Sequence, residues 1–485
     1  MDTIKKVVIA VIFLHVNSCA YYPISSSNKI VRKITVEEHP VIYARQDQDC
    51  DASRALGNFS SHVKVWLAGK DGELVQEAFD LADISLNGLN SEFISSTVFI
   101  PDEVNRRDFL NSVGAAPGFS DFQALNALDD KIDSTQYQNI YFCRPEGGYQ
   151  RDSLENVALS ALVGIKQAFA THRAVATGKK KSSIYKDLEK IQLVIHPKLF
   201  AFEERNEKNS IVKKYYVDNG FWTILPSGKK IIAVLPHSEE MEEQSRLKFW
   251  EQPAIFAHEY GHHIFNSYAP SVLERASSVF ASAAEARVVQ GFNEGIADLI
   301  AYWSMFLDKQ FYSMMHFGYT DAGYRDIGND SIRYYHLDVN IKKIFDEQLV
   351  AEMTHACSHQ KSHFLDQNLY FEKYLRQEPH HTGAVVAFTF NKIATASGCE
   401  HELKKFENLI LWLDTWEKLY KNKKLPDGKA YLEQGLLSWI TLFKKTFHDY
   451  SLEERNDLDN EFWLTEIRQL FPIYEKKWFE EGHFS

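Results

Sequence analysis

The chain lacks several features that mark specialised protein classes. Its 485 residues include only 23 glycines and 13 prolines, too few for a collagen-like or low-complexity chain. It is also short of positive charge. Its net charge of −12 argues against a dedicated nucleic-acid binder, because phosphate binding requires clustered basic residues. No uninterrupted apolar run reaches about 18 residues, which excludes a polytopic membrane protein. What is present, 45% hydrophobic and 25% charged residues, is typical of a globular chain of roughly three domain-sized units.

One short apolar run lies at the N-terminus. Lys5 and Lys6 precede the apolar residues 7–14, and Ser18 and Cys19 follow. The run is too short to span a hydrocarbon core but is typical of a signal peptide. Ser18 before Cys19 resembles a bacterial lipoprotein processing site, where the cysteine is lipidated and becomes the new N-terminus. A plain signal peptide cut nearby is the alternative. We expect an exported protein, anchored to the membrane only by lipid and facing the periplasm or the cell surface.

Export determines how the five cysteines are interpreted. If Cys19 is lipidated, four remain, and an even number in an oxidising compartment permits two disulfides. Of the three possible pairings we favour Cys50–Cys143 and Cys357–Cys399, because each closes a loop within one expected domain. Free buried thiols are the alternative.

The chain divides into five expected segments. Residues 1–18 form the signal peptide, and residues 19–40 form a tether. Residues 41–150 carry short strand patterns and turn signals, which predict a β-containing N-terminal domain that is either a propeptide or a structural module. Residues 151–400 begin with an amphipathic helix pattern and form the expected catalytic core. Residues 401–485 form a helical C-terminal extension.

The strongest motif is His-Glu-x-x-His at residues 258–262. Histidines four residues apart on a helix project from nearly the same face, so His258 and His262 are candidate ligands of one metal ion. Glu259 stands beside them and is a candidate general base that takes a proton from a metal-activated water. With 19 histidines and 66 acidic residues, the pattern arises by chance often enough to require a second, independent motif.

The second motif is Asn-Glu-Gly-Ile-Ala-Asp at residues 293–298. Hydrolytic zinc sites usually have three protein ligands and a water, and Glu294 is the candidate third ligand from a second helix. Asp298 lies one turn further along the same helix face. It is a candidate to accept a hydrogen bond from a ligating histidine and so fix its tautomer. A solvated acidic helix face is the alternative interpretation of both acids.

Together the two motifs resemble those of the thermolysin-like metallopeptidases of the gluzincin group. That family has His-Glu-x-x-His followed, some tens of residues later, by Asn-Glu-x-x-x-Asp, and both patterns match here at every key position. The resemblance implies that zinc is bound by His258, His262 and Glu294. It also implies that Glu259 is the general base and that Asp298 orients His258.

A weaker match precedes the zinc helix. Residues 218–222, Asp-Asn-Gly-Phe-Trp, look like the family's edge-strand segment, Asn-Ala-aromatic-aromatic, which hydrogen-bonds the substrate backbone. The resemblance implies that Asn219 and Gly220 bind substrate, with Gly220 in place of the usual alanine. An edge strand has unpaired N–H and C=O groups, to which an extended peptide can add as another strand. A buried aromatic turn is the alternative.

Two further matches concern the reacting carbonyl. In residues 378–383, Glu-Pro-His-His-Thr-Gly, His380 has the His-x-x-Gly spacing of the family's histidine that donates a hydrogen bond to the developing oxyanion. His381 is the alternative donor. Arg325 lies roughly where the family keeps an arginine that contacts the substrate carbonyl. A helix-capping or surface histidine and a structural salt bridge are the other interpretations of these residues.

We therefore expect an α+β fold of thermolysin-like architecture. A twisted, mostly antiparallel sheet with an exposed edge should pack on the zinc helix, and a mainly helical C-terminal lobe should form the other wall of the cleft. The expected activity is zinc-dependent endopeptidase hydrolysis of a peptide or protein substrate, with no nucleic-acid partner.

Two other functions are compatible with these motifs. In a non-catalytic exported lipoprotein, a structural zinc site would join the lobes and another surface would bind a partner. Structural zinc sites, however, usually have four protein ligands and often use cysteine, and neither holds here. A zinc hydrolase of another bond, such as a cell-wall amide, is the third possibility.

Overall fold

The computed structural model describes residues 36–37, 40–43, 45–46, 62–68, 73–80, 92–100, 103–104, 128–132, 148–178, 185–205, 209–239, 247–276, 283–306, 383, 387, 390–391 and 402–421. The chain forms two compact units. The first comprises Met1–Ala174, Lys186–Ile264 and Ile300–Ala322, and the second comprises Val175–Tyr185, Phe265–Leu299 and Gly323–Ser485. Each unit is described by itself below.

The central sheet of the first unit has the strand order β4-β6-β10-β9. These strands are β4 (Ile94–Phe99), β6 (Ile191–Ile195), β10 (Lys230–Val234) and β9 (Gly220–Ile224). The pairs β4–β6 and β6–β10 are parallel, and only β10–β9 is antiparallel. Our expectation of a mostly antiparallel sheet is therefore wrong for this sheet. The mixture of helix and sheet in the described residues nevertheless agrees with the expected α+β class.

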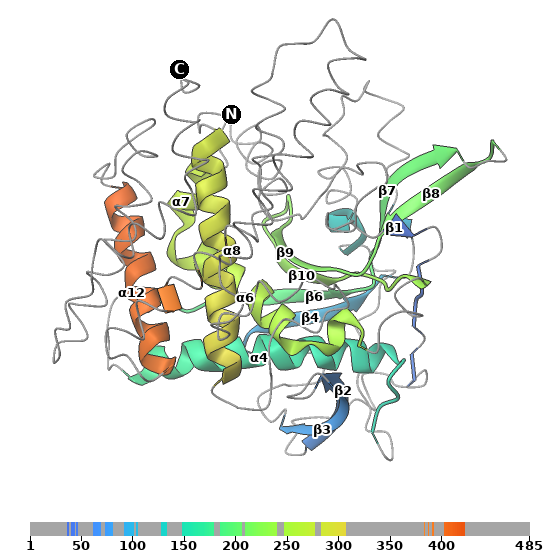
Figure 1. The fold of residues 1–485 in the computed structure, drawn as a ribbon, viewed down its shortest axis with the longest axis horizontal. Coiled ribbons are helices and arrows are strands. Elements are labelled where there is room, and N and C mark those ends of the chain that lie inside the picture. Colours follow the sequence, from blue (N-terminus) through green and yellow to red (C-terminus); the bar gives the residue numbers. More distant parts are fainter. Residues whose placement is uncertain are drawn as a thin grey trace, which may run out of the picture. The chain divides into compact units, whose positions relative to one another are not determined.

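The parallel pairing of β4 and β6 follows from the helix between them. α4 (Leu154–Gly178) lies between the two strands in sequence and runs along them in space, so it returns the chain to the end at which β4 began (Figure 1). Ser153 caps the N-terminus of α4, since its Oγ accepts a hydrogen bond of 3.1 Å from the N–H of Asn156. The residues of its first turns are buried almost without exception.

The zinc helix predicted from the sequence is α6 (Pro253–Tyr268), and it crosses α4 closely. A Cβ at Gly164 of α4 would lie 1.9 Å from the carbonyl oxygen of Pro253 and 3.0 Å from the nitrogen of Ala257. Only glycine permits this approach, because any side chain would overlap the α6 backbone. Gly164 thus sets the distance between the two helices.

One face of the central sheet covers an apolar core. The cluster is entirely aliphatic and fully or almost fully buried, and its members are Val98, Ile100, Val104, Leu128, Val194, Leu199, Leu225, Ile231, Ala233 and Leu235. Burying such a cluster provides a large apolar driving force for folding, at roughly 25 cal/mol per Å² removed from water. The sheet is therefore held on this face independently of the metal motif.

Residues before position 150 are built into the same unit as the metal motif. β4 supplies a strand of the central sheet, and β2 (His62–Ala68) contacts α4. The N–H of Trp66 on β2 donates to Asn156 Oδ1 at 2.9 Å, and its C=O accepts from Ser160 Oγ at 2.9 Å. The expected boundary between residues 41–150 and 151–400 is thus not a boundary between the two compact units.

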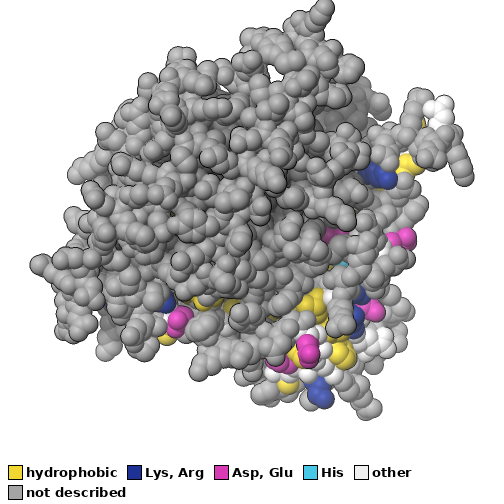
Figure 2. Space-filling model, viewed as in Figure 1, with side chains coloured by type: hydrophobic (Ala, Val, Ile, Leu, Met, Phe, Trp, Pro, Cys, Tyr) yellow, Lys and Arg dark blue, Asp and Glu magenta, His cyan; other side chains and the backbone are white. Residues whose placement is uncertain are grey.

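Two smaller β structures complete the first unit. β2 pairs with β3 (Leu74–Asp80) as an antiparallel ribbon, near which charged side chains of both signs lie among apolar ones (Figure 2). A second four-stranded sheet has the order β1-β8-β7-β5. Its strands are β1 (Val36–Glu37), β8 (Ile211–Tyr216), β7 (Lys198–Arg205) and β5 (Glu103–Val104).

In the second unit, every described element is a helix or part of one. The principal elements are α7 (Pro270–Ala276), α8 (Ala283–Phe306, whose last residues belong to the first unit) and α12 (Glu402–Lys421). An aromatic cluster joins α8 to α12, with the ring of Phe292 6.0 Å from that of Trp412 and 5.6 Å from that of Trp416. The described residues of this unit are therefore helical, whereas most of residues 401–485, the expected helical extension, lie outside the described residues. Among the residues that the structure describes, no helix is both long and apolar enough to cross a membrane.

Candidate metal centre

α6 brings the first motif together as its spacing predicts. The helix begins with Pro253, whose missing N–H costs nothing at the first helical position. The ring centroids of His258 and His262 are 4.5 Å apart. One ligand atom each from His258, Glu259 and His262 lies within 4.8 Å of the others, and all three side chains are buried. Two imidazoles and a carboxylate in this arrangement are positioned to bind a metal ion.

The carboxylate of Glu259 is held by the central sheet. Its Oε2 accepts a hydrogen bond of 2.7 Å from the backbone N–H of Trp222 on β9. Hydrogen bonds to a charged acceptor are stronger than neutral ones, and they fix the orientation of the carboxylate. The sequence did not indicate this contact, which joins residues 37 positions apart.

β9 lies at the end of the central sheet in the described part of the chain, as expected for an edge strand. Asn219 and Leu225, which flank β9, each form a hydrogen bond with a residue that flanks β10. The N–H of Leu235 donates to Asn219 O, and the N–H of Leu225 donates to Lys229 O. In an antiparallel pair every second residue points its N–H and C=O away from the partner. The outward groups are therefore those of Gly220, Trp222 and Ile224.

The predicted substrate-binding residues Asn219 and Gly220 lie at the start of this edge. Asn219 Oδ1 accepts the N–H of Gly220 at 2.9 Å. A Cβ at Gly220 would lie 3.1 Å from a ring carbon of Phe256 on α6, so a larger residue would require the ring or the strand to shift. Gly220 thus permits a close contact between β9 and α6.

His263, next to His262, is directed elsewhere. Its Nε2 lies 2.8 Å from the carbonyl oxygen of Glu189, and its ring lies 5.2 Å from that of Tyr260. Burial, reinforced by the charge of Lys230, lowers the pKa of His263 to about 3. It is therefore neutral at pH 7 and serves to pack α6 against the segment before β6. Sequence reasoning did not identify this role.

Glu294 and Asp298 lie on α8 in the second unit, 3% and 0% exposed. Such burial contradicts the alternative of a solvated acidic face, because carboxylates are seldom buried without a partner. A Cβ at Gly383 would lie 2.6 Å from Glu294 Cβ and 2.8 Å from the nitrogen of Gly295. The glycine of the predicted His-x-x-Gly segment therefore lies directly against the candidate third ligand.

Gly383→Ala is expected to displace Glu294. The added methyl group overlaps a side chain and a helix backbone, and overpacking of this kind costs about 1–3 kcal/mol. We expect a lower free energy of unfolding and a weaker affinity for zinc, measured by thermal unfolding and by chelator competition. Gly228→Ala is the control, since it has the same change of residue where no atom lies within 4 Å. Gly228 has a φ of 89, so the alanine that replaces it has a strained backbone, yet this variant should leave zinc affinity unchanged.

Several predicted residues lie outside the described residues. They are the candidate oxyanion donors His380 and His381, the arginine Arg325, the lipidation site Cys19, and the disulfide candidates Cys50, Cys143, Cys357 and Cys399. Their assignments remain predictions from the sequence.

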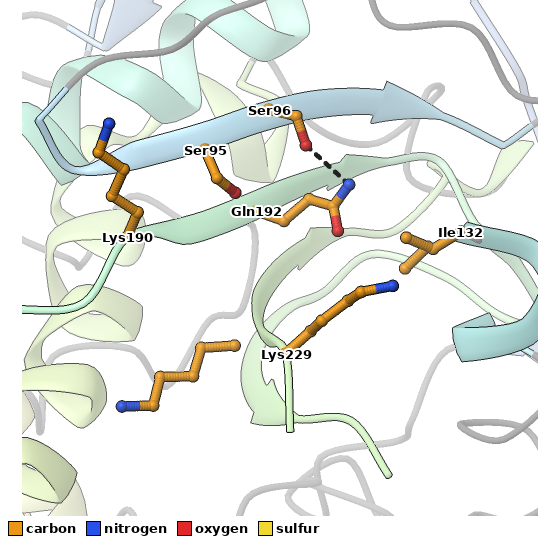
Figure 3. A pocket seen from close by; sticks show the side chains of 7 residues that line it. Ser95, Ser96, Ile132, Lys190, Gln192 and Lys229 are labelled. Carbon is orange, nitrogen blue, oxygen red and sulfur yellow. Dashed lines mark hydrogen bonds between the residues drawn. The ribbon is translucent and has the colours of Figure 1, made fainter. Parts of the chain in front are cut away.

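A surface hollow of about 320 Å³ has no residue of the metal motif in its lining. It is lined by polar residues of β4 and β6, where Gln192 Nε2 donates to Ser96 Oγ at 2.7 Å, and Lys190 and Lys229 lie on different sides of this pair (Figure 3). None of the residues that line it is a predicted site residue. The metal motif is thus distinct from this hollow.

A second buried histidine gives the fold a predictable pH dependence. Burial, together with the charges of His237 and Lys248, lowers the pKa of His196 from 6.5 to about 3. Between these values the unfolded chain binds a proton that the folded chain does not. The free energy of unfolding should therefore fall as the pH is lowered from about 6.5 towards 3, by up to about 1.4 kcal/mol per pH unit from this group.

His196→Asn tests this dependence. His196 has a φ of 52, a conformation that asparagine tolerates better than most other residues with a side chain. Chemical denaturation from pH 7 down to pH 4, which passes the unfolded value of 6.5 and stays above the folded value of about 3, should give a shallower pH slope for the variant than for the natural protein. Equal slopes would contradict the assignment. His172, whose pKa burial lowers to about 4, contributes equally to both proteins.

Comparison of the chain with protein-family models, with curated proteins and with solved structures gives no match. The motifs and the geometry of the described residues are therefore what indicates a function.

Proposed function

We propose that the protein is a zinc-dependent endopeptidase. The observation that carries the proposal is the buried cluster of His258, Glu259 and His262, whose ligand atoms lie within 4.8 Å of one another. The contact of Glu259 with the edge strand β9 supports it, because it places the candidate general base beside backbone groups that can bind an extended peptide.

The donor set fits zinc. Imidazole nitrogens and carboxylate oxygens are its usual ligands, and catalytic sites have three of them and an open position. We assign His258, His262 and Glu294 as the ligands and Asp298 as the acceptor that orients His258, on the strength of the two motifs and of the burial of both acids. When bound, zinc supplies Lewis acidity towards a carbonyl group and a water molecule.

The chain's own groups perform the remaining steps. Glu259 takes a proton from the attacking water and later delivers it to the nitrogen of the leaving amine, so one carboxylate serves as base and then as acid. The hydrogen bond from Trp222 fixes the orientation of the Glu259 carboxylate for this proton transfer. Gly220 and its neighbours on β9 hold the substrate as an added strand, aided by Asn219, and Arg325 contacts the substrate carbonyl.

We assign the oxyanion donor to His380. His380→Ala should lower turnover by about a hundred- to a thousandfold, the usual cost of removing one such donor, with zinc content unchanged. His381→Ala should have a small effect, because adjacent side chains point in different directions. A large loss for His381→Ala alone would transfer the role to that residue.

Metal analysis combined with peptide-library cleavage tests the proposed function. The purified protein should contain zinc, cleave internal peptide bonds, lose activity with a chelator and regain it with zinc. Zinc without cleavage of any peptide would favour the non-catalytic alternative, and cleavage confined to cell-wall amides would favour the third. We also propose export as a lipoprotein, which predicts Cys19 as the first residue of the mature protein.

A further inference from the structure

A short N-terminal segment contacts three distant segments of the first unit. We name residues 40–43 and 45–46 the N-terminal strap. The N–H of Val41 donates to the carbonyl oxygen of His237 at 2.8 Å, and the Tyr43 hydroxyl accepts from Lys248 Nζ at 2.6 Å. The strap therefore contacts two segments that lie about 200 residues further along the chain.

Through His237 the strap is linked to Asp218, which precedes the edge strand β9. His237 Nδ1 lies 2.7 Å from Asp218 Oδ1, and both side chains are buried. The same carboxylate oxygen accepts the N–H of Ser238 at 2.9 Å, and the N–H of Asp218 donates to Pro236 O at 2.8 Å. Asp218 has a φ of 53, so it forms the left-handed turn from which β9 starts. Asp218 thus fixes where the edge strand begins.

Through Lys248 the strap is linked to Glu251, just before α6 begins. Lys248 is 3% exposed, and its ammonium also donates to Asp152 Oδ1 at 2.6 Å. Its backbone N–H donates to Glu251 Oε2 at 2.8 Å, and Glu251 is held by both arms of Arg151, at 2.6 and 2.9 Å. Lys248 directly precedes the turn η1 (Phe249–Glu251), and Glu251 ends it, two residues before α6 begins.

The other end of the strap is fixed to α4. Arg45 Nε lies 3.2 Å from Glu155 Oε1, and the N–H of Gln46 donates to Glu155 Oε2 at 2.9 Å. Glu155 is fully buried, so the strap supplies partners that a buried carboxylate requires. The strap is therefore an integral part of the unit.

We propose that the N-terminal strap is a positioning element of the metal site. It joins the start of β9, which holds Glu259 through Trp222, to the approach to α6, which carries the two histidines. Tyr43, Lys248 and Asp218 are positioning residues, and the mature protein keeps the strap rather than releasing it as a propeptide. The inference rests on the proposed function for its activity measurements, and for its metal measurements only on zinc binding by the cluster of His258, Glu259 and His262.

Tyr43→Phe tests the branch towards the zinc helix. It removes only the hydroxyl that accepts from Lys248 and leaves the ring in place. The dissociation constant for zinc, measured by chelator competition well below the unfolding temperature, should rise up to about tenfold, the lower end of the range for residues bonded directly to a metal ligand, because Tyr43 acts through Lys248 and the approach to α6. Arg173→Ala is the control, because it removes an exposed ion pair with Glu92 in the same unit, and it should leave zinc affinity unchanged.

Asp218→Asn tests the branch towards the edge strand. Asparagine keeps the left-handed turn and an acceptor for Ser238 but loses the charge that faces His237. The KM for a cleaved peptide should rise about tenfold with little change in kcat or zinc affinity. The two variants should therefore have separable effects, one on the metal and one on substrate binding.

Two results would overturn the proposal. One is that Tyr43→Phe lowers the unfolding temperature and leaves zinc affinity unchanged, which would make the strap a structural clamp only. The other is an active mature protein whose N-terminus lies beyond residue 46. Zinc affinity is measured without substrate, so it tests the strap even if the natural protein cleaves no peptide and the proposed function fails.

Discussion

Glu259→Gln should retain zinc and lose peptide hydrolysis. The amide keeps the size of the carboxylate and can still accept the N–H of Trp222, but it cannot take a proton from water. Removal of a general base lowers turnover by about a hundred- to ten-thousandfold. Metal content by atomic absorption and single-turnover cleavage of a peptide identified in the library screen measure the two effects separately.

The matched control is Glu73→Gln, which makes the same change at an exposed glutamate of the first unit. It should leave both metal content and turnover near those of the natural protein. Near-normal turnover of Glu259→Gln would contradict the mechanism. Loss of zinc from this variant would instead show that Glu259 is a ligand, which the approach of its carboxylate to both histidines also permits.

Glu294→Ala should lose zinc as well as activity. If Glu294 is the third ligand, its removal leaves two histidines, and zinc affinity should fall by more than the 10–100-fold usual for residues that only support a ligand. For Asp298→Asn the loss of zinc affinity should fall within that 10–100-fold range, because this change disturbs the orientation of His258 without removing a ligand. Chelator competition on the purified variants gives both values.

Glu402→Ala is the control for Glu294→Ala. Glu402 is an acid of the same unit, in the first turn of α12, and its side chain is 20% exposed. Its removal should not change zinc affinity. If Glu294→Ala binds zinc as tightly as Glu402→Ala does, the third ligand must come from another residue.

The parts of the site that the sequence predicts well are those set by local geometry. The spacing of His258, Glu259 and His262 on one helix follows from the helical repeat, and the structure brings their ligand atoms together. The position of β9 at the end of its sheet, among the described strands, was expected from the resemblance of residues 218–222 to the family's edge-strand segment. Both depend on short segments whose pattern can be read without knowledge of the rest of the chain.

The parts that the sequence does not predict depend on contacts between distant segments. The parallel pairing of β4 with β6 requires knowledge of how α4 packs, and the strap at Tyr43 meets Lys248, 205 residues away. Gly383 looked like one position in a histidine motif, whereas its lack of a side chain is what permits the contact with Glu294. No local pattern carries the information for such contacts, because each depends on the packing of complete elements.

X-ray absorption at the zinc edge of the purified protein is the most direct test of the central claim. Two imidazole ligands and a carboxylate predict a coordination sphere of nitrogen and oxygen only, at about 2.0–2.2 Å, with one position open to water. The same measurement on Glu294→Ala should show the loss of this sphere. A sphere that contains sulfur at about 2.3 Å, or four protein ligands with no open position, would contradict a catalytic site at His258, His262 and Glu294.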